Sequence, residues 1–246
     1  MTELHVVALS GGKDSTALAL RLAETAPRDY TYVCTPTGDE LPEMFAHWRQ
    51  LGERLGKAIT PVVGGTLDGL IEKQNALPNW RQRWCTRMLK IEPYRAWLMQ
   101  QSEKYERIVS YVGLRADEEG RAGGMYDDIP GVEMRFPFRE WGWGLQDVWK
   151  YLIQKDVTIP ARTDCARCFY QTLGQWWDLW KQHPDLYAEA EAQEKTTGHT
   201  FRSPGRDTWP AALKELRERF ETGYVPRGAE LNMDLFGRSQ CRACSM

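Results

Sequence analysis

The sequence predicts an α/β protein, with a parallel sheet carrying helices on both faces over residues 1–140 and a helical C-terminal region over residues 141–246. Short apolar runs alternate with helix-like segments in the first part of the chain, the pattern of a parallel sheet with crossover helices. A glycine-rich turn joins the first apolar run to the first helical segment. After Pro137 only helical patterns remain, separated by glycine- and proline-containing breaks.

Each element of the core has its own signal. Leu18 and Leu22 give the first helix an inward face, and the stretch YTYVCT alternates as a strand does. Pro42 near its start and Gly56 at its end delimit the second helix. Strands are expected at residues 4–9, 30–35, 58–63 and 107–112, and helices at 14–25, 41–56 and 86–101. This β-α-β-α-β order favours parallel strand pairing.

The C-terminal region is expected to be helical at residues 145–154, 173–183, 185–195 and 210–223. A Cys-x-x-Cys pair, Cys165 and Cys168, lies on a loop between two of these segments. A second pair, Cys241 and Cys244, lies in what we expect to be a terminal tail.

Composition narrows the class of protein. The 246 residues carry a formal net charge of −2, so no global electrostatic attraction to nucleic acid or acidic membranes is expected, although a local basic patch stays open. No apolar run reaches the ~18 residues of a membrane-spanning helix, and the N-terminal residues lack the features of a secretory signal. We therefore expect a cytoplasmic, soluble protein, in which the six cysteines are not a disulfide framework.

The turn after the first strand has the chemistry of a phosphate-binding loop. Glycines let the backbone approach a phosphate, and the N–H groups and dipole of the following helix favour an anion. A lysine and two serines add a charge and hydroxyl donors. The alternative is a tight strand-to-helix turn capped by Ser15. The loop residues are Ser10, Gly11, Gly12, Lys13, Asp14 and Ser15.

Two common phosphate-loop patterns do not fit this turn. Asp14 follows Lys13 where the Walker pattern needs Ser or Thr, and the dinucleotide pattern G-x-G-x-x-G is also absent. The turn resembles instead the PP-loop, S-G-G-x-D-S, of the ATP pyrophosphatases, which cut ATP between the α and β phosphates.

Four further segments resemble the phosphoadenosine-phosphosulfate (PAPS) reductase superfamily: TGDELPEM at 37–44, RWCTRMLKIEPYRAWL at 83–98, GLRADEEGR at 113–121 and HPDLYAEAEAQEKTTGHTF at 183–201. The resemblance implies a Rossmann-like fold of the adenine nucleotide alpha-hydrolase-like type, with a PP-loop nucleotide-binding core at 1–140. It adds Thr37, Gly38, Glu40 and Gly113 to the nucleotide-binding residues. The family usually has an aspartate where this chain has Pro36, so Asp39 or Glu40 is the candidate to supply that carboxylate for magnesium.

The intact loop favours ATP over an already activated sulfonucleotide, because the reductases of this superfamily typically lose the lysine and the aspartate. We expect attack at the α phosphorus with Mg²⁺ bound, release of pyrophosphate, and an adenylated acceptor. The candidate catalytic residues are Lys13, Asp14, Lys90 and Arg115, and Arg87 is a weaker candidate.

The resemblance also implies a metal site. Cys85, Cys165 and Cys168 stand where related reductases and thiolases place the ligands of a 4Fe–4S cluster, and Cys241 or Cys244 could complete the set. Zinc is an equal alternative for such soft ligands, and unligated thiols are a third. Cys34, inside a strand, is expected to be a buried apolar residue.

Three functions stay open from the sequence. The first is an adenylating enzyme of sulfur transfer, whose acceptor is DNA, tRNA or inorganic sulfate, with an unspecified sulfur donor and with partner proteins expected. The second is a thiol-dependent sulfonucleotide reductase that uses the tail cysteines, Cys241 and Cys244, and the third is a non-catalytic nucleotide-binding subunit. The aromatic and basic segments NWRQRW and QWWDLWKQ could stack nucleic-acid bases, although helical spacing in the second favours core packing.

Overall fold

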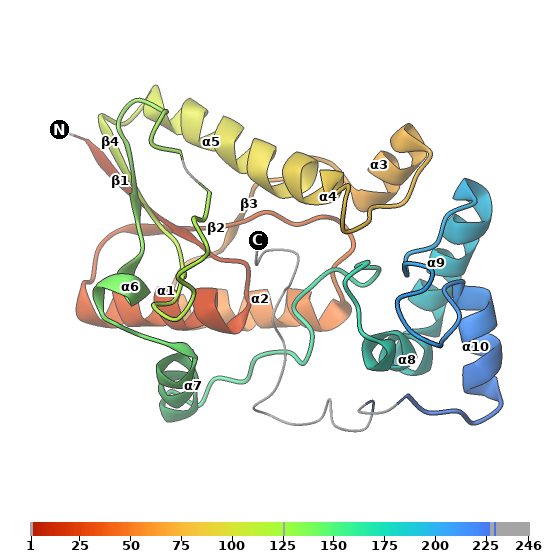
Figure 1. Cartoon of the computed structure of the whole chain (residues 1–246). Coiled ribbons are helices and arrows are strands. Elements are labelled where there is room, and N and C mark those ends of the chain that lie inside the picture. Colours follow the sequence, from red (N-terminus) through yellow and green to blue (C-terminus); the bar gives the residue numbers. More distant parts are fainter. Residues whose placement is uncertain (1, 125, 227–228, 230–246) are drawn as a thin grey trace.

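The computed structural model describes residues 2–124, 126–226 and 229. Within them, the centre of the molecule is a parallel sheet with the strand order β3-β2-β1-β4-β5 (Figure 1). The strands are β1 (Glu3–Ala8), β2 (Tyr30–Cys34), β3 (Thr60–Pro61), β4 (Arg107–Tyr111) and β5 (Val132–Arg135). The strand order reverses on either side of β1, and ligands of open α/β sheets bind at the carboxyl ends of the strands at such a point.

Alternate residues of β1 face two different cores, because successive side chains of a strand point to opposite faces. Val7 packs in a cluster with helices α1 (Lys13–Thr25) and α7 (Leu145–Gln154), and Val6 packs in another with α5 (Glu92–Ser102). Figure 1 shows α5 on one side of the sheet and α1 and α2 (Pro42–Leu55) on the other. The predicted α/β architecture with helices on both faces is confirmed.

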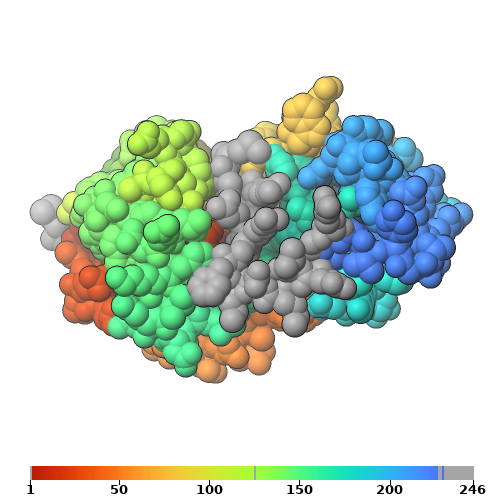
Figure 2. Space-filling view, turned by 60° about the horizontal axis from the view of Figure 1, so that its bottom comes forward, coloured from red at the N-terminus to blue at the C-terminus, as the bar shows by residue number. Residues whose placement is uncertain are grey.

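A third core lies among the C-terminal helices α8 (Leu173–Gln182), α9 (Pro184–Thr197) and α10 (Leu213–Glu221). Trp176 is fully buried at its centre, so this part of QWWDLWKQ is core, as its helical spacing indicated. The cluster also contains Ile71 of α3 (Leu67–Gln74), which ties these helices to the first half of the chain. In Figure 2 they gather at one end of the molecule, coloured cyan to blue. Helix α7, which lies beyond residue 140, packs instead on α1; the division at that residue stays a prediction.

One long helical segment contains an irregular turn. It begins as α4 (Trp84–Thr86), passes through a π-helical turn, η1 (Arg87–Ile91), and continues as α5. In that turn the Glu92 N–H donates to the Arg87 carbonyl, five residues back. The next residue, Pro93, has no N–H to donate, which disfavours a regular α-helical pattern there. Such turns occur frequently at functional sites.

Several elements differ from the sequence-based expectation. The strand expected at 58–63 pairs only over Thr60–Pro61, because Pro61 cannot donate to the ladder and the strand lies at the sheet edge. Strand β5, helix α3 and the short helix α6 (Pro137–Glu140) were not predicted. None of the helices in the described ranges is long and apolar enough to cross a membrane.

Candidate functional site

The glycine-rich loop closes on itself through its two serines. Ser10 Oγ and Ser15 Oγ are 3.0 Å apart, and Ser15 Oγ accepts from the Gly11 N–H at 3.1 Å. Ser15 Oγ also donates to the Gly12 carbonyl, and Gly12 is the residue that precedes the first turn of α1. The loop is therefore preorganised by its own side chains at the helix N-terminus, where an anion is favoured.

Helix α2 supports the loop from outside. Trp48 Nε1 donates to the Ser10 carbonyl at 3.0 Å, and buried His47 lies 3.4 Å from Thr16 Oγ1 in the first turn of α1. Burial lowers the pKa of His47, against a hydrogen bond with the Gly11 backbone that raises it. Gly11 has φ +86°, and a Cβ on it would lie 2.5 Å from Trp48 Nε1. Position 11 therefore requires glycine for two reasons: its φ is positive, and Trp48 leaves no space for a side chain.

Three charged groups meet at the end of the loop. Asp14 Oδ2 accepts from Lys13 Nζ and from Arg115 Nη1, each at 3.0 Å. Both cations are buried, with side chains 5% exposed. Burial lowers the pKa of Arg115, but Asp14, Asp117 and Glu118 more than offset this and raise it overall. Asp14 Oδ1 is buried without a hydrogen-bond partner, so one carboxylate oxygen is available to a ligand.

A cavity of about 330 Å³ opens over this loop. Its wall comes from the carboxyl ends of β1, β2 and β4, which is the location expected for a ligand of a parallel sheet. Gly113, after β4, comes so close to the first turn of α1 that a Cβ would lie 3.2 Å from the Asp14 carbonyl. Of the predicted nucleotide-site residues, the cavity is lined by Ser10, Gly12, Lys13, Asp14, Ser15, Lys90, Gly113 and Arg115.

The predicted Thr37–Glu40 segment forms a different part of the site. The Glu40 carboxylate accepts from the N–H groups of Thr37 and Gly38 at 2.7 and 3.0 Å, so it closes its own turn. Asp39 is 4% exposed and accepts from the Arg167 backbone at 2.9 Å and from its guanidinium at 2.5 Å. The Asp39 carboxylate therefore holds the Cys-x-x-Cys loop to this turn, and the Glu40 carboxylate fixes the turn itself. The assignment of Asp39 or Glu40 to magnesium stays a prediction, and neither residue lines the cavity over the glycine-rich loop, whereas Asp14 does.

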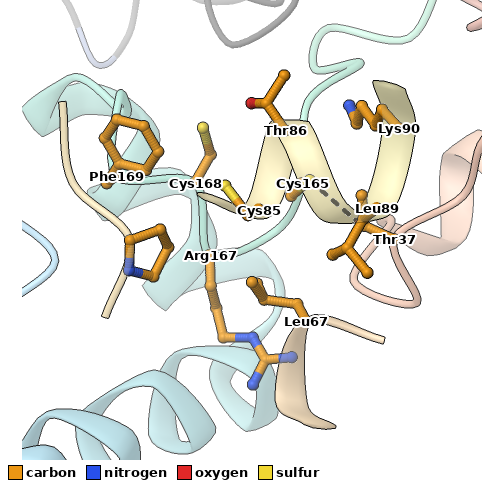
Figure 3. Close-up of a pocket in the computed structure, with 11 residues that line it drawn as sticks. Thr37, Leu67, Cys85, Thr86, Leu89, Lys90, Cys165, Arg167, Cys168 and Phe169 are labelled. Carbon is orange, nitrogen blue, oxygen red and sulfur yellow. Dashed lines mark hydrogen bonds between the residues drawn. The ribbon is translucent and has the colours of Figure 1, made fainter. Parts of the chain in front are cut away.

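The three predicted metal-ligating cysteines within the described residues line one small pocket. Figure 3 shows Cys85, Cys165 and Cys168 around it, with the side chain of Arg167 pointing away from the sulfurs. Thr37 Oγ1 and Cys165 Sγ are 3.2 Å apart. Residues 85 and 165 come from segments far apart in the chain, so the folding has gathered them. Cys241 and Cys244 lie outside the described residues.

Burial raises the pKa of all three thiols, to about 12 for Cys165. Lys90 opposes this effect at both Cys85 and Cys165. In the described part of the chain no three His, Cys, Asp or Glu side chains form a group arranged to hold a metal ion. Thiol sulfur is nevertheless the donor type that iron–sulfur clusters and zinc take, so the chemistry of the set fits either group.

We call the pocket lined by Cys85, Cys165 and Cys168 the cysteine pocket, and the cavity over the glycine-rich loop the nucleotide cavity. The two are adjacent, because Thr86 and Lys90 line both. The π-helical turn carries Lys90 at this shared wall. Arg87, by contrast, pairs with Glu92 on the surface. Cys34, predicted to be a buried apolar residue, is buried and lines the nucleotide cavity, and burial raises its pKa to about 11.

A family model described as the phosphoadenosine phosphosulfate reductase domain matches residues 4–177. The chain belongs to this family. The PAPS reductase domain thus includes the sheet, the glycine-rich loop and both described cysteine segments, and the match ends inside α8.

Two uncharacterized proteins of Methanocaldococcus jannaschii are each 23% identical to this PAPS reductase-family chain, over 232 and 197 residues. The alignments cover 86% and 76% of the chain but 54% and 40% of the relatives, so the chain spans about half the length of the curated relatives it matches.

Two solved structures are similar to the chain. The PAPS reductase from Candida auris, in a phosphate complex, is 13% identical with a TM-score of 0.47, over 65% of this chain and 75% of that one. The U34-tRNA thiolase NcsA from Methanococcus maripaludis, with its 4Fe–4S cluster, is 17% identical with a TM-score of 0.45, over 100% of this chain and 80% of that one.

Sequence reasoning missed several residues of this family member's site, and three of them have polar side chains at its key contacts. Thr163 reaches the nucleotide cavity, Arg167 pairs with Asp39, and Thr86 lies on the shared wall. Thr86 was within a segment already quoted, but nothing local marks it. Thr163 lies two residues before Cys165, and Arg167 lies between Cys165 and Cys168. This closeness in sequence to the Cys-x-x-Cys pair is the one signal that could have found them.

Proposed function

We propose that this chain is a PP-loop ATP pyrophosphatase-type enzyme that binds ATP with Mg²⁺ and adenylates an acceptor in a sulfur-transfer reaction. The observation that carries the proposal is the meeting of Lys13, Arg115 and Asp14 at a preorganised glycine loop beneath a cavity of about 330 Å³. Two buried cations and a helix N-terminus suit a polyphosphate, and one lone carboxylate oxygen suits its cation.

In this reaction a nucleophile of the acceptor attacks the α phosphorus. The bond from that phosphorus to the oxygen bridging the α and β phosphates breaks, and pyrophosphate leaves with the electron pair. The Lys13 ammonium and the loop N–H groups stabilise the charge that develops on the leaving group. Arg115, fixed by Asp117 at 2.8 Å, orients a phosphate oxygen.

Magnesium fits this site through Asp14 Oδ1, which is buried without a partner, and the ion would supply charge neutralisation at the phosphates. The protein's own groups position the phosphate-binding cations, because Asp14 Oδ2 keeps Lys13 and Arg115 beside the loop. Gly113 lets β4 approach the loop closely.

The experiment that tests the function uses ATP labelled at the α or the γ phosphate, with Mg²⁺. AMP or an adenylated acceptor, together with labelled pyrophosphate, is the expected result. ADP with inorganic phosphate contradicts cleavage between the α and β phosphates. Bound but unchanged ATP, with each candidate acceptor present, would instead support the non-catalytic subunit.

We also propose that Cys85, Cys165 and Cys168 hold an iron–sulfur cluster or zinc beside this cavity. Such a group would supply soft-metal sulfur chemistry next to the adenylated acceptor. The chain's own contribution is to bring the three thiols into one pocket, and Lys90 favours their thiolate forms at Cys85 and Cys165.

Metal analysis of anaerobically purified protein checks this placement. Iron or zinc should be bound by the wild type and lost from the Cys85→Ser variant. Cys34→Ser is the matched control, because Cys34 is buried but does not line the cysteine pocket. Equal metal content in all three folded proteins, zero included, contradicts the proposed ligand set.

The sulfonucleotide reductase alternative relies on the tail cysteines, Cys241 and Cys244, which lie outside the described residues. Attack on sulfur needs a thiolate, and burial raises the pKa of Cys165 and Cys168, which disfavours these two residues as the attacking group. Release of sulfite from PAPS in the presence of thioredoxin would favour that alternative.

A further inference from the structure

The Cys-x-x-Cys loop reaches two sites at once. Cys165 and Cys168 line the cysteine pocket, and Thr163, two residues before Cys165, lines the nucleotide cavity. Thr163 is therefore the point at which the loop that carries the thiols touches the space over the PP-loop.

The Thr163 hydroxyl is placed as a ligand group without a partner. Its Oγ1 is buried and makes no hydrogen bond within the described residues. It lies beside the PP-loop, because a Cβ built on Gly12 would be 3.5 Å from Thr163 Oγ1 and 3.6 Å from Ser10 Oγ. Buried hydroxyls are normally paired, so an unpaired one beside an anion-binding loop calls for an acceptor.

Other residues hold the loop in place, so the hydroxyl is not needed for that purpose. Arg162 Nη2 donates to the Cys165 carbonyl at 2.8 Å, and Gln171 Nε2 donates to the Ala166 carbonyl at 2.5 Å. Arg167 pairs with Asp39 on the facing turn. The backbone of the loop is thus fixed by its neighbours, and Thr163 presents its hydroxyl from a rigid position.

We propose that Thr163 Oγ1 donates a hydrogen bond to a phosphate oxygen of the nucleotide on the PP-loop, which ties the cysteine loop to the bound nucleotide. The inference rests on the proposed function, since it needs a phosphate in that cavity. It makes Thr163 a phosphate-binding residue that the second half of the chain contributes beside Gly12. The nucleotide is then held by both the N-terminal loop and the cysteine loop.

The test compares Thr163→Val, which keeps the shape and removes the hydroxyl, with Thr163→Ser, which keeps the hydroxyl. Dissociation constants are measured by calorimetry for ATP, pyrophosphate and adenosine. Because the lost bond is to a charged group, Thr163→Val should bind ATP and pyrophosphate about tenfold more weakly or worse. Adenosine affinity should not change, and Thr163→Ser should bind all three like the wild type. Thr31→Val on β2, which lines neither pocket, is the matched control.

The outcomes separate this inference from the function on which it rests. If the wild type binds neither ATP nor pyrophosphate, both the proposed function and the Thr163 assignment are overturned. If it binds them and Thr163→Val binds them equally well, the Thr163 assignment alone is overturned. Equal loss of ATP and adenosine affinity would also overturn it, because a structural role for Thr163 would affect the whole cavity.

Discussion

Replacing Lys13 by methionine should reduce kcat/KM for pyrophosphate release from ATP by about 10²–10³-fold. The ammonium group is buried at the loop, 3.0 Å from Asp14 Oδ2, and it faces the leaving pyrophosphate in the proposed reaction. Charge stabilisation in a site shielded from water is worth far more than on the surface, so no exposed lysine should substitute for it. Steady-state kinetics of pyrophosphate release measure the effect.

Lys150→Met on α7 is the control for this substitution, because Lys150 is exposed and lines neither pocket. It should leave kcat/KM within about twofold of the wild type, as expected for a change remote from the reacting atoms. Both variants should melt near the wild-type temperature. A folded Lys13→Met protein that keeps more than a tenth of the wild-type kcat/KM would remove Lys13 from the catalytic group.

Gly11→Ala should both destabilise the fold and weaken ATP binding by about tenfold or more, through the loss of loop preorganisation. Its φ of +86° lies where an L residue costs about 1–2 kcal/mol. The added Cβ would also lie 2.5 Å from Trp48 Nε1 and 2.8 Å from Met44 Cε, so the loop or α2 must shift. A shift breaks the bond from Trp48 to the Ser10 carbonyl and misplaces the loop N–H groups to which the proposed function assigns phosphate binding.

Gly198→Ala separates the cost of a positive φ from the effect of the clash with α2. Gly198 has φ +68° at the end of α9, and a Cβ there has no atom within 4 Å. This variant should show the backbone cost in urea unfolding with unchanged ATP affinity. Wild-type ATP affinity in Gly11→Ala would mean that the loop geometry does not set nucleotide binding.

The first β-α unit could be predicted in detail because its signals are local. The strand, the glycines and the helix follow one another within residues 3–25. The two glycines mark the turn, although residue type does not show that Gly11 has a positive φ and Gly12 a negative one. Strand β5 could not, because VEMR is short and is defined by pairing with β4 rather than by its own pattern. The third strand was overextended for the same reason, since only pairing shows where Pro61 ends it.

The roles of the acidic residues show more clearly what could not be predicted from the sequence. The sequence made Asp39 a magnesium candidate because the family usually has an aspartate where this chain has Pro36, and Asp39 and Glu40 are the nearest carboxylates. Its partner Arg167 lies 128 residues away, and only the folded chain shows that the two bind one another. The unpaired oxygens of Asp14 and Thr163 are likewise invisible in sequence, because a missing partner is a property of the whole environment.

The wall shared by the two pockets makes Lys90 an electrostatic link between them. Its positive charge favours the thiolates of Cys85 and Cys165 while facing the cavity proposed for phosphates. An anion that binds in the nucleotide cavity offsets part of the Lys90 charge, so the thiolate forms of Cys85 and Cys165 become less favourable. By thermodynamic reciprocity, negative charge on the sulfurs weakens retention of the anion by an equal factor.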